Sequence, residues 1–233
     1  LSTTATAGSL QQLTAYAGAT PNSVVFDNRA YARFFVADGA SLWGSVNTGA
    51  SFTDLTSNLT ALNIARPLAL EFISTNGVNA LLVGGLVTAA NAPSPIATAD
   101  SDNAGTLTNW RPLGTNLPNT LVSHLAYNPV VDVLAVGLFG RGAWLLYDVT
   151  SYFPSATVLR FGLADNDSAP DASFLTGARP LEKVGSGTLT IGGDTSYTGT
   201  TSVKAGMLVA NASLASSSGL TVDAGATVRG FGT

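Results

Sequence analysis

The sequence has 233 residues, of which 45% are hydrophobic, so the chain can bury a core and is not a disordered protein. Only 10% are charged, with a net charge of −4 and scattered basic residues, which excludes a nucleic-acid surface built on clustered Lys and Arg. Cysteine is absent, so we expect stability to come from packing rather than from disulfides. Separately, we expect no cofactor.

The segment 1–163 favours an all-β fold, because short apolar runs alternate with Gly, Asn, Asp and Pro and helical periodicity is almost missing. The run from Phe52 to Leu59 recurs as Trp110 to Leu117, with an aromatic, a Leu, an Asn and a Leu in the same places. A repeat of about 50 residues built from short strands indicates β-propeller blades. About three blades are present, fewer than the four that close a ring, so we expect a partial propeller.

From about position 180 the repeat shortens. The segment 200–211 aligns with the segment 219–230, and in both copies Val, Ala-Gly and Val coincide. A period of about 20 residues with alternating apolar positions predicts the first coils of a right-handed parallel β-helix. We therefore expect blades over 1–163, a linker over 164–179 and a β-helix over 180–233.

A column of aliphatic side chains is expected inside this β-helix, because each inward position repeats from coil to coil. The predicted inner residues are Leu181, Leu189, Ile191, Val203, Leu208, Val209, Leu220, Val222 and Val228.

Two resemblances follow from these motifs. The stretch from Leu181 to Ile191, with Thr195 to Val203 and Ala205 to Leu208, resembles the passenger-associated β-strand repeat of bacterial autotransporters, although Thr195 stands where Asn is common. Ser45–Phe52 resembles, in degenerate form, the Ser-x-Asp-x-Gly-x-Thr-Trp hairpin of Asp-box (BNR) propellers, with Asn47 for Asp and Phe52 for Trp.

The autotransporter resemblance implies a passenger exported across the outer membrane to the bacterial surface. It also implies a C-terminal translocator β-barrel as partner, outside this sequence. The chain begins at Leu1 without a signal-peptide pattern, so we expect an internal fragment. Candidate ligands for the blade loops are a host or environmental carbohydrate or a protein.

The sequence contains no clear arrangement of residues for nucleophilic or acid–base catalysis, and we predict no catalytic residue. His124, the single histidine, alternates with apolar residues on an expected strand, as a structural blade residue would. Glu71 and Glu182 are the only glutamates. A glycosidase would need two carboxylates that face each other across the sugar bond. The candidates to supply them are Asp27, Asp38, Asp54 and Asp132. Asp38 and Asp54 are interpreted more simply as turn caps. Arg33, Arg66 and Arg141 are the arginines that a sialidase-like site could use.

Metal binding is expected to be absent too. The segment with Asp165, Asp167 and Asp171 resembles a calcium loop, but it lacks the turn Gly and the late Glu of an EF-hand. A solvated linker is therefore the simpler interpretation.

The segment Phe139–Gly142 predicts a tight turn between strands rather than a phosphate loop. Phe52, Trp110 and Trp144 are expected in blade cores, and one that proved exposed could stack on a sugar.

The sequence thus favours a surface-exposed or secreted segment of an autotransporter passenger, with a β-helical stalk that seeds folding and a blade region that acts as an adhesion or ligand-presenting scaffold. The alternative is an enzymatic one: these are the last blades of a secreted propeller glycoside hydrolase, sialidase-like or xyloglucanase-like, whose catalytic residues lie outside this sequence.

Overall fold

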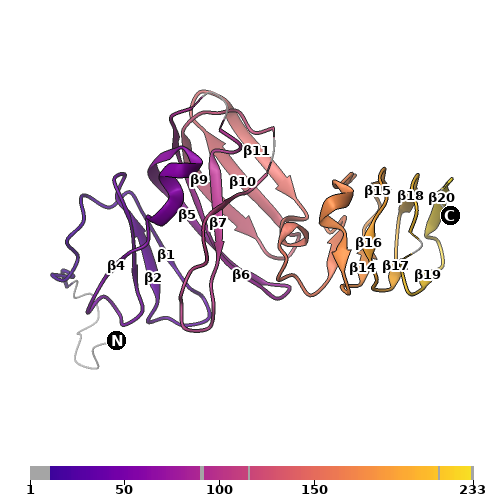
Figure 1. Ribbon diagram of the computed structural model, residues 1–233, viewed down its shortest axis with the longest axis horizontal. Helices are drawn as coiled ribbons and strands as arrows, with labels where there is room; N and C mark the ends of the chain where they lie inside the picture. Colours follow the sequence, from indigo (N-terminus) through magenta and orange to yellow (C-terminus); the bar gives the residue numbers. More distant parts are fainter. Residues whose placement is uncertain (1–10, 90–91, 115, 215, 232–233) are drawn as a thin grey trace. The chain divides into compact units, whose positions relative to one another are not determined.

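The computed structural model describes residues 11–89, 92–114, 116–214 and 216–231. Among them the fold is almost all β, as predicted, with three short 3-10 helices. None of the described helices is long and apolar enough to cross a membrane. The chain forms two compact units (Figure 1). The second comprises Thr75–Val78, Tyr127–Leu134 and the chain from Leu145 onward, and the first comprises the rest.

Three sheets in which neighbouring strands follow one another along the chain lie wholly or mainly in the first unit. The first two sheets are four-stranded meanders, β1-β2-β3-β4 and β5-β6-β7-β8, and the third has the order β11-β10-β9. β1–β2, β2–β3, β3–β4, β6–β7 and β7–β8 pair antiparallel. The strands are β1 (Ser23–Phe26), β2 (Phe34–Ala37), β3 (Leu42–Ser45), β4 (Thr53–Asp54), β5 (Ile64–Thr75), β6 (Val78–Val87), β7 (Ile96–Asp100), β8 (Arg111–Pro112), β9 (Val122–Asn128), β10 (Val133–Leu138) and β11 (Gly142–Tyr147). A 3-10 helix, η1 (Ser57–Leu62), joins the first two sheets.

Local chemistry explains these meanders. β2 is a run of aromatic and aliphatic residues, and β6 consists mostly of Val, Leu and Ala, as suits strands buried on both faces. Asn76 and Gly77 have φ of 51° and 78°, the left-handed pair that a two-residue hairpin between β5 and β6 requires. The core between the first two sheets contains Phe35 and Phe72, whose rings stack at 5.9 Å, and it includes Trp110.

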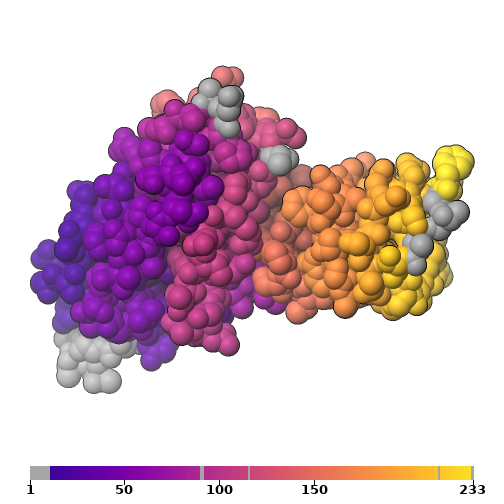
Figure 2. Space-filling view, in the orientation of Figure 1, coloured from indigo at the N-terminus to yellow at the C-terminus, as the bar shows by residue number. Residues whose placement is uncertain are grey.

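The second unit is a parallel β-solenoid of about four turns, which confirms the predicted β-helix. Its sheets have the orders β12-β14-β17-β19, β15-β18-β20 and β13-β16, and every pair is parallel. Figure 2 shows the coils following one another as bands from orange to yellow. The strands are β12 (Leu159–Phe161), β13 (Thr176–Gly177), β14 (Leu181–Lys183), β15 (Thr188–Ile191), β16 (Ser196–Tyr197), β17 (Thr201–Val203), β18 (Met207–Ala210), β19 (Leu220–Val222) and β20 (Thr227–Gly230), with the 3-10 helices η2 (Val149–Tyr152) and η3 (Ala172–Phe174).

The solenoid starts at β12, well before the expected start at position 180. Leu159 and Phe161 pair with Leu181 and Lys183, and the expected linker, 164–179, forms the rest of this first coil with η3 and β13. The step along the chain from Leu159 to Leu181 is longer than the later steps from Leu181 to Thr201 and from Thr201 to Leu220. The first coil therefore falls outside the repeat that is visible in the sequence.

Candidate functional site

The inner column of the solenoid consists of side chains that stack in register from coil to coil. Leu189 pairs with Leu208, and Leu208 with Val228, so one apolar position repeats through three coils. Leu181, Leu189, Ile191, Val203 and Leu208 are fully buried, as predicted for the inner column. Each coil therefore covers the aliphatic side chains of the coil before it.

Three residues that were predicted to be buried in the inner column are partly or largely exposed. Val209 was predicted to point inward, but it is only partly buried, because Leu208 and Ala210 take the inward positions of β18 and side chains alternate along a strand. Leu220 and Val222 are 53% and 46% exposed, although they pair in register with Thr201 and Val203. No further coil covers them within the described segment 216–231.

Lys183 occupies an inward position that the sequence analysis missed. It lies in register between Phe161 and Val203 and is 0% exposed. Its Nζ donates to the carbonyl oxygens of Val184, Gly185 (2.9 Å) and Ala205 (3.3 Å), one carbonyl for each ammonium proton. Burial lowers the pKa of Lys183, against the opposing charges of Asp148, Asp165 and Asp167. The ammonium thus links the turns of two successive coils from inside.

Tyr197 is a second inward residue that sequence reasoning missed. Its hydroxyl lies 2.5 Å from Oγ1 of Thr201, which lies 2.9 Å from Oγ of Ser217. Ser217 in turn donates to the carbonyl of Gly199 at 2.9 Å. This chain of hydroxyls gives the buried polar groups partners across neighbouring coils.

The outer surface carries a charge ladder. Glu182 accepts from Arg160 Nε at 2.9 Å and from Lys204 Nζ at 2.6 Å, and these residues come from three successive coils. Burial favours the neutral carboxyl, but the hydrogen bonds from Lys204 and Arg160 outweigh it and lower the pKa of Glu182. Glu182 therefore serves coil stacking.

The suggested calcium loop has a structural role instead. Asp165 accepts from the Ser186 backbone N–H at 2.6 Å, and Asp167 accepts from the Thr188 N–H at 2.7 Å. Asp171 caps η3 through the Ser173 N–H at 2.9 Å. The two aspartates at the first coil's turn thus bind the next coil, so they are not the solvated linker that the sequence suggested. No group of three or more potential metal ligands lies together among the described residues.

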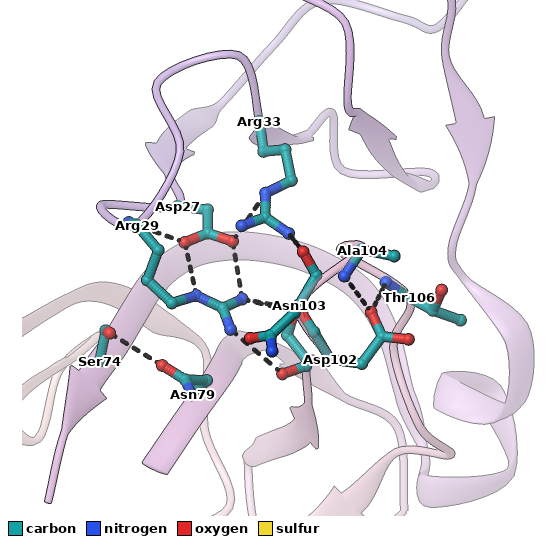
Figure 3. Close-up of polar contacts among 10 residues, drawn as sticks. Asp27, Arg29, Arg33, Ser74, Asn79, Asp102, Asn103, Ala104 and Thr106 are labelled. Atoms are coloured by element: carbon teal, nitrogen blue, oxygen red, sulfur yellow. Dashed lines mark hydrogen bonds and ion pairs between the residues drawn. The ribbon is translucent and has the colours of Figure 1, made fainter. Parts of the chain in front are cut away.

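A buried ion cluster in the first unit holds one of the predicted arginines (Figure 3). Asp27, fully buried, accepts two hydrogen bonds from the guanidinium of Arg29, at 2.9 and 2.8 Å, and forms an ion pair with Arg33 at 3.2 Å. Arg29 also binds Ser101, and Arg33 donates to the Asn103 carbonyl at 2.6 Å. The cluster ties the β1–β2 hairpin to the loop between β7 and β8, and it neutralises Asp27.

The other catalytic candidates lie in separate contacts. Asp38 accepts from the backbone of Ala19, Ala40 and Ser41 and from the side chains of Tyr16 and Trp43, which confirms the predicted turn cap. Burial opposes these bonds, but they lower the pKa of Asp38 to about 2.

Asp54 caps the Thr56 N–H at 2.8 Å, also as predicted, and Asp132 is bound by Tyr127 and Thr150. His124 lies exposed on β9, Glu71 is half-buried on β5, Arg66 lies beside the Gly39 carbonyl, and Arg141 lies in the exposed β10–β11 turn.

The three repeated aromatics have different environments. Trp110 is buried between the first two sheets, as expected, and its Nε1 donates to the Leu55 carbonyl at 3.0 Å. Trp144 was expected in a core but is 39% exposed on β11, beyond the Phe139–Gly142 turn that the sequence correctly placed between two strands. Phe52 borders a groove of about 1020 Å³ with the rings of Tyr16, Phe26, Tyr31 and Phe34.

The comparison with known families points to the solenoid. Residues 181–210 match the passenger-associated-transport-repeat family. The matched repeat covers β14 to β18, the second coil and most of the third, and it includes Lys183, Leu189, Tyr197 and Leu208. Together with the solenoid it supports an autotransporter passenger, a class that is secreted to the cell surface. No curated protein matches the chain.

Proposed function

We propose that this chain is a segment of an autotransporter passenger in which the solenoid serves as stalk and folding seed. The observation that carries this proposal is the passenger-associated-transport-repeat at residues 181–210, within continuous parallel pairing from β12 to β19. We further propose that the parent chain's translocator is the partner and that the segment acts on the outside of the cell.

Templated stacking is the mechanism that the contacts favour. A folded coil offers a row of backbone donors and acceptors, and it offers aliphatic side chains for the next coil to cover. Burying one Leu such as Leu189 or Leu208 contributes about 2 kcal/mol, and the gain recurs with each coil. Coils that fold outside the cell cannot slide back through a narrow pore, so this gain would bias export outward.

The test is surface display of the parent protein with Leu189→Asp or Val203→Asp. Each places an unpaired charge in the inner column, which costs several kcal/mol, so we expect display to fall. Thr190→Asp is the matched control, because Thr190 follows Leu189 and points outward. Normal display of both inward variants, at equal total protein, would refute the folding-seed role.

We also propose that the first unit is part of a β-propeller. Two observations support this. First, both four-stranded sheets are meanders. Second, in the loop before the last strand of each sheet, a side-chain oxygen accepts from the backbone N–H four residues later. Asn47 Oδ1 accepts from Ser51, and Asp102 Oδ1 accepts from Thr106. The second of these loops escaped the sequence analysis, because a longer segment separates it from the following aromatic.

The aromatic groove fits this arrangement. Phe52 directly precedes β4, as Trp110 directly precedes β8, and the Trp110 face of the second sheet packs against the first. The equivalent face of the first sheet carries the groove, so a further blade of the parent polypeptide would pack there. Tyr31 is 72% exposed in this chain. Hydroxyl-radical footprinting should find it protected in the parent polypeptide, and equal modification in both would contradict a covering blade.

We propose that the exposed end of the third sheet binds the ligand of the passenger. Trp144 and Phe139 are 39% and 74% exposed, and an exposed indole can stack on a sugar ring. We propose that they contact a carbohydrate or protein surface and that the described residues act in binding rather than catalysis. Binding of the chain to a glycan array should be lost in Trp144→Ala and kept in Val130→Ala, an exposed residue of the other unit. Binding that is unchanged in Trp144→Ala would exclude this surface.

A further inference from the structure

β12 is the edge strand of the first parallel sheet of the solenoid. A strand in a parallel sheet bonds to one neighbour through alternate residues and to the opposite side through the residues between them. The Leu159 N–H donates to the Pro180 carbonyl, and the Val184 N–H donates to the Phe161 carbonyl, so Leu159 and Phe161 bond toward the second coil. The backbone groups of Val158, Arg160 and Gly162 therefore point the other way. An unprotected edge of this kind would accept a strand from another chain.

Asn76 occupies the first of these positions. Its Oδ1 accepts from the Val158 N–H at 3.2 Å, and its Nδ2 donates to the Val158 carbonyl at 2.8 Å. The carboxamide thus presents the same donor and acceptor pair that a neighbouring strand would present. The φ of 51° at Asn76 belongs to the turn that aims this side chain.

Ser151 and Asp148 occupy the next two positions. Ser151 Oγ accepts from the Arg160 N–H at 2.8 Å and donates to the Arg160 carbonyl at 2.7 Å. Asp148 Oδ1 accepts from the Gly162 N–H at 2.7 Å, while its other oxygen binds Asn166 and Ser168. Ser151 and Asp148 are 1% and 2% exposed.

We propose that Asn76, Ser151 and Asp148 form an edge cap: three side chains that imitate a neighbouring strand and bar strand addition at β12. Their spacing carries the argument. They meet backbone groups at every second residue, 158, 160 and 162, which is the repeat of a strand, and two of the three satisfy both the N–H and the carbonyl. Because the three side chains come from the β5–β6 turn and from η2 and its N-cap, no continuous strand is needed to supply these bonds.

The excluded partner is a β-strand of a second copy of this chain. Two β12 edges could pair antiparallel only if these side chains were displaced. The cap thus keeps copies of this chain from pairing through β12 and leaves β19, the opposite edge of the same sheet, open for stacking. This inference goes beyond the proposed passenger function and stands without it, because it depends only on contacts within the second unit.

The test uses the whole chain with Ser151→Ala and with Asn76→Gly plus Ser151→Ala. Glycine keeps the left-handed backbone at position 76 and removes only the carboxamide. Ser202→Ala is the matched control: it also removes a hydroxyl from the solenoid, but one that bonds the Thr221 side chain instead of edge backbone.

Two measurements test whether the edge cap protects β12. In hydrogen–deuterium exchange of Ser151→Ala, the Arg160 amide should exchange about tenfold faster or more, while the Leu159 amide should keep its rate because its partner is Pro180. In sedimentation velocity at rising concentration, the double variant should form dimers, whereas the unchanged chain and Ser202→Ala should stay monomeric.

A double variant that remains monomeric, or an unchanged chain that itself dimerises through β12, would overturn the proposal. If the double variant fails to fold, the exchange of the Arg160 amide in Ser151→Ala decides, because this single change removes one hydroxyl. An unchanged Arg160 exchange rate would then also reject the cap.

Discussion

At the scale of single residues, the buried ammonium of Lys183 offers the sharpest test of the solenoid. Replacing Lys183 by Met keeps the length of the side chain but leaves the carbonyls of Val184, Gly185 and Ala205 without their donor. We expect the free energy of unfolding to fall by about 3 kcal/mol in urea titrations. Lys204→Met, which removes a half-exposed partner of Glu182, should cost less than about 1 kcal/mol. Equal losses for the two variants would show that the inner ammonium has no special role.

Asp38 should make the stability of the first unit pH-dependent. Its pKa of about 2 in the folded chain lies below the ordinary value of 3.8, so the folded state is favoured while the carboxyl is ionised. This contribution, about 2 kcal/mol, is complete above about pH 4 and is lost as the pH falls toward 2. The stability difference between the unchanged chain and Asp38→Asn, followed by tryptophan fluorescence, should therefore shrink over that interval. A difference that stays constant from pH 5 to 2 would contradict the assignment.

The role of a residue could be predicted from the sequence where its contacts lie within a few neighbouring residues. The turn caps Asp38 and Asp54 were identified from neighbouring Gly, Thr and Ser, because an Asp side chain binds backbone close by in the sequence. Lys183 could not be assigned in this way, since its third carbonyl comes from Ala205, one coil later. Asp27 was a candidate carboxylate in sequence, and only the fold shows that it pairs with Arg33, whose guanidinium also donates to the distant Asn103 carbonyl.

At the scale of the element, the turns that end each strand of the solenoid set how closely coils approach. Gly206 and Gly225 occupy the same place in successive coils, and both have positive φ, 67° and 86°. A Cβ at Gly206 would lie 2.3 Å from the Gly187 carbonyl oxygen, whereas a Cβ at Gly225 would meet nothing within 4 Å. The backbone oxygen cannot move without breaking the stack.

The pair therefore separates backbone strain from coil packing. Gly225→Ala should cost about 1 kcal/mol, as expected for an alanine in the left-handed region, while Gly206→Ala should cost about 3 kcal/mol or more in the same unfolding assay. If Gly206→Ala cost no more than Gly225→Ala, the coils would be more loosely stacked than these distances imply.

The elements themselves show what a sequence repeat can predict. The coils from β14 to β20 were predicted because apolar residues and Gly recur at a nearly constant interval, and a regular period is what identical stacking requires. The first coil escaped because its step from Leu159 to Leu181 is longer and its turn is built from Asp165 and Asp167 rather than from paired glycines. Val209 was placed inside because it is apolar, although strand alternation gives that place to its neighbours on β18.

At the scale of the whole molecule, the two units are stabilised in different ways. The first unit buries side chains between sheets, with Phe35, Phe72 and Trp110 in a shared core. The second is a one-dimensional stack in which each coil contacts its neighbours, so its stability is a sum of coil and interface contributions. Such a stack opens first where a coil has a neighbour on one side only.

This asymmetry predicts a gradient of hydrogen exchange along the solenoid of this chain. The amides of β14 and β15 should exchange most slowly, since their coil is covered on both sides and contains Lys183 and Leu189. The amides of β19 and β20 should exchange fastest, because Leu220 and Val222 are about half exposed there. β12 should stay protected despite its edge position, because side chains supply its outward bonds. Exchange at one uniform rate from β12 to β20, measured in native conditions, would mean that the solenoid opens as a single cooperative unit and that neither edge is weaker than its middle.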